Sequence, residues 1–120
     1  MIGMTPSTRV FVAIEATDMR KSFDGLSALA RAIVGEDPLS GHLFVFANRA
    51  RNRLKILVWD GSGLWVLAKR LEKGTFRWPT HDGDSSSGRH HATIRHDELA
   101  ALLGGLDIER AARRRWHRVG

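Results

Sequence analysis

Two apolar runs joined by a tight turn constrain the fold of this chain more than any other feature. The runs RLKILVWD (53–60) and LWVLAKRL (64–71) are rich in branched and aromatic residues, which favour β-strands. The residues DGSG (60–63) between them tolerate tight and left-handed backbone conformations. The pattern predicts an antiparallel hairpin in which Trp59 faces Leu64 and Arg53 faces Arg70.

The side chains of this hairpin divide into two faces, because successive residues of a strand point in opposite directions. The expected core face carries Leu54, Ile56, Val58, Trp65, Leu67 and Leu71, interrupted by Lys69. The other face carries Lys55, Leu57, Trp59, Leu64, Val66, Ala68 and Arg70. We therefore expect Trp65 in the core, whereas Trp59 and Trp78 stay open between core packing and stacking on unpaired bases.

The remaining elements follow from shorter patterns. Strands are predicted for RVFVAI (9–14), LFVFA (43–47) and TFRW (75–78), which are short and rich in branched and aromatic residues. A helix is predicted from Ser22, since Phe23, Leu26, Leu29, Ala30 and Ile33 recur at helical spacing until Gly35 and Pro38 end it. A second helical pattern runs over Ile94 to Leu106, with Gly104 and Gly105 expected to end the helix. The fold class is α+β, a single domain in which an antiparallel β-meander of about four to six strands packs with two helices.

The length of 120 residues allows one ordinary core. We expect a domain over residues 1–109, containing a flexible polar loop at 80–92, followed by a basic tail at 110–120. The chain has no cysteine, which fits a reducing compartment. It has no secretory leader pattern and no apolar run of about 20 residues, so we expect a cytoplasmic protein without a membrane partner.

Basic residues are concentrated in two blocks. Residues 41–79 hold eight basic and two acidic side chains, and residues 110–120 hold five basic and no acidic ones. Such blocks create a local positive potential that attracts polyanions, nucleic acid first among them. An anionic membrane surface and simple solubility are the competing explanations for the charge.

The candidate DNA contacts come from these two blocks. In the hairpin register, Lys55 and Arg70 lie near the end that also presents Arg49 and Arg51 in the turn NRARN (48–52). In the tail, Trp116 stands among arginines and has little reason to be a core residue. The predicted DNA-binding residues are Arg49, Arg51, Arg53, Lys55, Lys69, Arg70, Arg77, Arg113, Arg114, Arg115 and Trp116.

No pattern for catalysis or for a resident cofactor is present. A two-metal nuclease needs converging carboxylates, yet Asp18, Asp24, Asp60 and Glu72 are accounted for better by turns and helix starts. A histidine-rich segment has the densest set of metal-ligand types, but its spacing matches no established site: His81, Asp82, Asp84, His90, His91 and His96. We therefore expect a binding protein without catalytic residues, metal, cofactor or small-molecule substrate.

Four motifs occur together in a specific order. They are TDMRKSFDGL (17–26), DPLSGHLFVFANR (37–49), LKILVWDGSG (54–63) and KRLEKGTFRWP (69–79). In order and spacing they resemble the small accessory protein of the IS66 family of bacterial insertion sequences. Two positions depart from that family, which usually has glycine where Ser22 stands and a more basic stretch where Ala50 stands.

The resemblance implies a role in DNA transposition and recombination beside a separate, larger transposase that carries the chemistry. Its implied partners are the ends of the insertion sequence, the transposase and the element's other accessory protein. Two hypotheses follow for the mechanism. The chain binds DNA through its basic hairpin surface, or it docks on the transposase without touching DNA.

Overall fold

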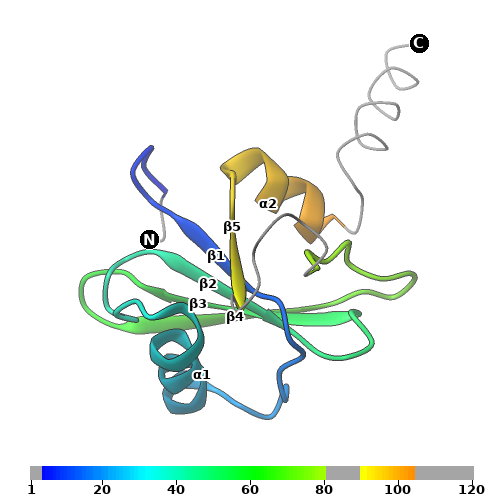
Figure 1. The fold of residues 1–120 in the computed structure, drawn as a ribbon, viewed down its shortest axis with the longest axis horizontal. Helices are drawn as coiled ribbons and strands as arrows, with labels where there is room; N and C mark the ends of the chain where they lie inside the picture. The colour runs from blue at the N-terminus through cyan, green and yellow to red at the C-terminus, as the bar shows by residue number, and fades with distance from the viewer. Residues whose placement is uncertain (1–3, 81–89, 105–120) are drawn as a thin grey trace.

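The computed structural model describes residues 4–80 and 90–104, and their core is one five-stranded sheet (Figure 1). The strand order is β4-β3-β2-β1-β5, so β4 and β5 form the two edges. The strands are β1 (Val10–Ala13), β2 (Leu43–Ala47), β3 (Arg53–Trp59), β4 (Leu64–Arg70) and β5 (His91–Ile94). The described residues thus confirm the predicted α+β class with two helices and a sheet of the expected size.

The first helical segment starts and stops where the sequence indicates. It consists of α1 (Phe23–Leu29), which continues directly into one wider turn, η1 (Ala30–Val34). Gly35 ends it in the left-handed region, with φ 78°, and donates its N–H to the carbonyl of Ala30. The second helix, α2 (His96–Leu103), ends at Gly104 as the sequence indicates, but it begins two residues after the predicted Ile94.

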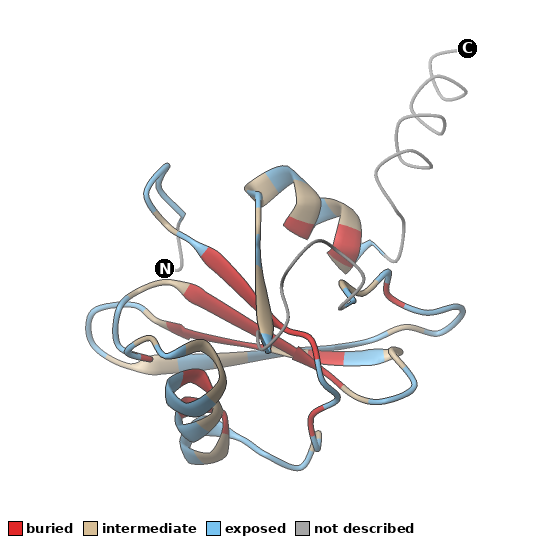
Figure 2. Cartoon of the chain, in the orientation of Figure 1, coloured by how far each residue is buried: buried red, intermediate tan, exposed pale blue. Residues whose placement is uncertain are grey.

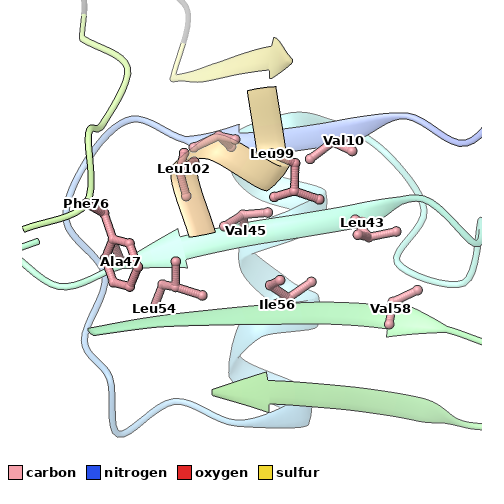
Figure 3. Packing of buried hydrophobic residues seen from close by; sticks show 11 residues of the cluster. Val10, Leu43, Val45, Ala47, Leu54, Ile56, Val58, Phe76, Leu99 and Leu102 are labelled. Carbon is pink, nitrogen blue, oxygen red and sulfur yellow. The ribbon is translucent and has the colours of Figure 1, made fainter. Parts of the chain in front are cut away.

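The two helices cover opposite faces of the sheet (Figure 1). Leu26 and Ala30 of the first helical segment pack on Phe44 and Leu57, and Figure 3 shows Leu99 and Leu102 of α2 over Val45 on the other face. Because both faces are covered, the central strands are buried on both sides, as their continuous apolar sequences VFVA and LFVFA require (Figure 2).

The prediction of a purely antiparallel meander is wrong, because the sheet is mixed. Only β2, β3 and β4 form a meander, in which Trp59 faces Leu64 and Arg53 faces Arg70 as predicted. β1 runs parallel to β2, since the helical segment between them carries the chain back across the sheet. β5 then pairs antiparallel with the free side of β1.

Two further assignments need correction. The residues TFRW (75–78) form no strand; instead Phe76 inserts beside Ala47 and Leu54 and closes one end of the core (Figure 3). The predicted flexible loop at 80–92 overlaps β5, which begins at His91, while residues 81–89 of that loop lie outside the described residues.

The edge strand β4 also differs from expectation. Trp65 and Leu67 are 46% and 41% exposed, so the assignment of Trp65 to the core is wrong. Their neighbours in β3, Val58 and Ile56, lie on the same face and are buried. The coverage of this face therefore ends at β3 and leaves the edge strand open.

Candidate nucleic-acid interface

The basic turn between β2 and β3 is held by Asn48. The Asn48 Oδ1 atom accepts hydrogen bonds from the backbone N–H groups of Asn52 and Arg53, both at 3.1 Å. Its amide nitrogen donates to Asn52 Oδ1 at 2.8 Å, and the Arg51 N–H donates to the Asn48 carbonyl at 3.1 Å. These bonds fix the directions in which the arginines of the turn leave the backbone.

Arg51 points into the protein. Its Nη2 atom donates to the Ile14 carbonyl at 2.7 Å, and its guanidinium carbon lies 5.2 Å from the centre of the Trp78 ring. Its backbone carbonyl accepts from the N–H of Phe76 at 2.7 Å, and Trp78 Nε1 donates to the Ala13 carbonyl at 2.8 Å. Arg51 thus ties the end of β1 to the segment that carries Phe76 and Trp78.

The environment of Arg51 is that of a structural residue. Burial lowers the pKa of its guanidinium, and the charge of Glu15 opposes that shift. Its backbone has φ 58°, an uncommon conformation for a residue with a side chain. We infer that Arg51 stabilises the fold. The other arginines predicted for DNA contact at this end of the sheet do not share this role.

Arg53, Lys55 and Arg70 gather at one end of the sheet, on the face that α1 covers. Arg53 and Arg70 lie directly opposite each other on neighbouring strands, and both are exposed. With Met19, Leu54, Ala68, Lys69 and Glu72 they line a cleft of about 440 Å³, which we call the basic cleft. The register predicted from the sequence brings these three cations together as expected.

The segment before α1 completes this cleft, a contribution that the sequence patterns do not indicate. Met19 lines it, and Lys55 Nζ donates to the Lys21 carbonyl at 2.8 Å. Met19 and Lys21 belong to the motif TDMRKSFDGL. The order of this motif relative to the other three motifs was the only feature of the sequence that pointed to a role for these two residues. Glu72 pairs with Arg70 at 3.5 Å in a fully solvated setting, where such pairs contribute little.

The other predicted contacts are dispersed. Lys69 borders the basic cleft, but its side chain extends to the opposite face, where its Nζ donates to the Leu103 carbonyl at 2.7 Å and caps the end of α2. Arg49 and Arg77 are exposed. Arg113, Arg114, Arg115 and Trp116 lie outside the described residues.

The carboxylates singled out in the sequence serve local structure. Asp18 pairs with Arg20 at 2.7 Å, and hydrogen bonds from Arg20 lower the pKa of Asp18 to about 2. Asp60 Oδ1 accepts from the N–H groups of Ser62 and Gly63, and its Oδ2 accepts from Trp65 Nε1 at 2.6 Å. Among residues 4–80 and 90–104, no three histidine or carboxylate side chains are grouped to hold a metal ion.

Acidification is expected to release the indole of Trp65. The hydrogen bonds from Ser62, Trp65 and Gly63 lower the pKa of Asp60. The ionised carboxylate therefore stabilises the folded hairpin fully at pH values above about 4, the ordinary pKa of an aspartate. That contribution is lost as the pH falls through the lowered value. The NMR signal of the Trp65 indole proton should therefore stay constant down to about pH 4 and move only below it.

The variant Asp60→Asn supplies the control, because an amide offers one acceptor oxygen where the carboxylate offers two. Its indole signal should already be displaced at neutral pH. An indole proton that titrates at the ordinary aspartate pKa, or is unchanged in Asp60→Asn, would contradict the assignment of Asp60 as the anchor of this turn.

No helix within the described ranges is long and apolar enough to cross a membrane.

Comparison with known proteins gives a consistent picture. The family model described as IS66 Orf2 like protein matches residues 8–113. The proteins y4hO and y4jC of Sinorhizobium fredii are each 35% identical, over 89% and 95% of this chain and 88% and 92% of their own lengths. No solved structure gives a significant match. The chain therefore belongs to the IS66 Orf2-like family and is an accessory protein of a bacterial insertion sequence.

Proposed function

We propose that the chain supports transposition by binding DNA through the basic cleft and the turn beside it, without catalysing a reaction. The observation that carries the proposal is the pair Arg53 and Arg70, two exposed guanidinium groups directly opposite each other on β3 and β4. Like charges directly opposite each other on neighbouring strands destabilise a sheet. A phosphate between them removes that repulsion and accepts bidentate hydrogen bonds from each arginine.

The contact surface consists of cations at this end of the sheet, all exposed except Lys55, which is half-buried. Arg53, Lys55 and Arg70 bind phosphates in the cleft, Arg49 extends the surface along the turn, and Arg77 adds a contact nearby. Such contacts position a protein on DNA without reading base sequence. Arg51 and Lys69 are excluded from the proposed contact set, since the guanidinium of Arg51 is directed into the protein and the ammonium group of Lys69 is directed at α2 on the other face of the sheet. Lys55 also donates to a backbone carbonyl, that of Lys21, but it lies on the same face as Arg53 and Arg70.

The rest of the chain supports this surface. We propose that residues 1–109 form the binding domain and that the tail at 110–120 adds affinity through Arg113, Arg114, Arg115 and Trp116. The ends of the insertion sequence are the proposed DNA, and the transposase and the element's other accessory protein are the proposed protein partners. The absence of cysteine suits work in the cytoplasm.

Removing both opposed arginines should weaken DNA binding and its dependence on salt. In Arg53→Gln/Arg70→Gln, two phosphate contacts are lost, so the slope of log K against log salt should fall by about two. Affinity at moderate salt should fall roughly tenfold or more. Fluorescence anisotropy with a duplex from the end of the element measures both quantities.

The matched control is Arg9→Gln/Arg31→Gln, which removes the same charge. Arg9 precedes β1 and Arg31 lies in η1, at the end of the sheet opposite the basic cleft. The control should keep the salt slope within experimental error. Equal losses in both double variants would mean that net charge, and not the cleft, attracts the DNA.

The competing function is docking on the transposase with no DNA contact. It predicts that the purified transposase retains this chain in a pull-down after nuclease treatment, and that Arg53→Gln/Arg70→Gln leaves DNA affinity unchanged. The DNA-binding proposal predicts a measurable affinity of the isolated chain for DNA. Failure of the isolated chain to bind at low salt would favour the docking function.

A further inference from the structure

The outer edge of β4 combines an unpaired backbone with exposed apolar side chains. Among the described residues, β3 is its only neighbouring strand. The N–H of Leu71 bonds to Asn52 and the carbonyl of Gly63 accepts from Asp60, so odd-numbered residues direct their backbone groups toward β3. The backbone groups of Leu64, Val66, Ala68 and Arg70 therefore point outward.

The devices that normally protect a sheet edge are missing from the centre of this strand, since its charged residues, Lys69 and Arg70, stand at its end. Natural edge strands carry outward charges, prolines or bulges that prevent pairing. Trp65 and Leu67 instead expose large apolar side chains near the middle of β4. Lys69 is the only charged residue of β4 on the face of Trp65 and Leu67. Its ammonium group donates to the Leu103 carbonyl of α2 and is therefore not directed at the open edge.

We propose that this edge pairs with β4 of a second copy of the chain, antiparallel and with Leu67 on the twofold axis. Pairing centred on Leu67 uses the whole strand Leu64–Arg70. It places Leu64 opposite Arg70 of the second copy and Val66 opposite Ala68 of the second copy. These are the outward-directed residues, so each pair exchanges two backbone hydrogen bonds.

The side chains of the remaining pairs also match. Leu67 faces Leu67 of the second copy, and Trp65 faces the aliphatic stem of Lys69 of the second copy. These positions are pairs without backbone hydrogen bonds, where side chains approach most closely. One surface is thus complementary to itself, which is the requirement for a twofold interface between identical chains.

The charges do not oppose the pairing. Arg70 lies opposite Leu64 of the second copy, and six residues along a strand separate the two Arg70 side chains by about 20 Å. Both basic clefts then open on the same face of one continuous sheet, the face that α1 covers in each copy. The pairing would double the surface that we propose for DNA while leaving it accessible.

A cysteine at the axis tests this arrangement directly, because the full chain has no cysteine. Opposed residues of such a pair have Cα atoms about 4.5 Å apart, within the span of a disulfide. Leu67→Cys should therefore convert almost completely to a disulfide-linked dimer under mild oxidation without DNA. Leu39→Cys, at a residue 44% exposed in the loop before β2, should stay mostly monomeric.

Light scattering of the unmodified chain gives the second readout, with twice the single-chain mass expected. Ala68→Pro removes an outward N–H group and no bond to β3, so it should give a folded monomer. Leu67→Lys should do the same if the proline variant fails to fold. Three results would overturn the proposal: a single-chain mass for the unmodified protein, crosslinking of Leu67→Cys no faster than that of Leu39→Cys, or a dimer that persists in both edge variants. The edge of β4 would then be open or covered by another segment or protein.

Discussion

Replacing Phe44 by alanine is expected to lower the free energy of unfolding by about 3–5 kcal/mol. Phe44 is fully buried in the central strand β2, and its ring stacks on Phe11 with the ring centres 5.6 Å apart. It also packs with Leu26, Phe46 and Leu57 in the cluster beneath α1. Removing the ring leaves a cavity between two strands and a helix, none of which can close over it without disturbing the sheet.

Equilibrium unfolding in urea, followed by circular dichroism, measures this loss. Leu39→Ala is the control, because Leu39 is 44% exposed and its truncation should change stability by less than about 0.5 kcal/mol. A loss below about 1 kcal/mol for Phe44→Ala would contradict the placement of Phe44 at the centre of the core.

Replacing Arg51 by alanine is expected to cost about 2–4 kcal/mol of stability, although the residue belongs to an arginine-rich turn. The variant loses the hydrogen bond to the Ile14 carbonyl and the contact with the Trp78 ring, and it keeps the unfavourable φ of 58°. Arg51→Gly loses the same contacts but relieves the backbone. It should therefore be more stable than Arg51→Ala by roughly 1 kcal/mol.

The same unfolding measurement, combined with DNA binding, separates structural from functional arginines. Arg49→Ala, in the same turn but exposed, should change stability by less than about 0.5 kcal/mol. Folded Arg51→Ala should bind DNA nearly as well as the parent, since Arg51 lies outside the proposed contact set. An Arg51→Ala variant with unchanged stability and weakened DNA binding would reverse this assignment.

The hairpin was predictable from the sequence because a two-residue period and a turn fix its register. Trp59 opposite Leu64 follows from the DGSG turn alone, and with it the juxtaposition of Arg53 and Arg70. The parallel pairing of β1 with β2 was missed, since it requires the helical segment between them to carry the chain back across the sheet, whereas the meander prediction joined neighbouring strands by reversals only. β5 was missed because its four residues, HATI, carry no alternating pattern.

The position of a strand within the sheet limited the prediction for Trp65. Both faces of the hairpin are apolar, and nothing in the alternation distinguishes a central strand from an edge strand. β3 lies inside the sheet and is buried, whereas β4 is an edge and exposes Trp65. The same uncertainty explains why the edge proposed for self-pairing was assigned to the core.

The candidate site was predictable only where local register determines it. Lys55 and Arg70 share a face because of strand alternation, and Arg49 is exposed because it lies in a turn. Arg51 points inward through contacts with Ile14 and Trp78, which are distant in the sequence. Such contacts depend on the tertiary fold, and no pattern within the turn separates Arg51 from its neighbours.

The central claim is that DNA phosphates bind at the basic cleft. Its most direct test is an NMR titration of the full chain with a short duplex from the end of the insertion sequence, observed at the backbone amides. The account predicts that the largest salt-sensitive shifts among the described residues occur at Arg53, Lys55 and Arg70, with little change at Arg9 and Arg31. Largest shifts at α2 and β5, or no shift at low salt, would contradict it.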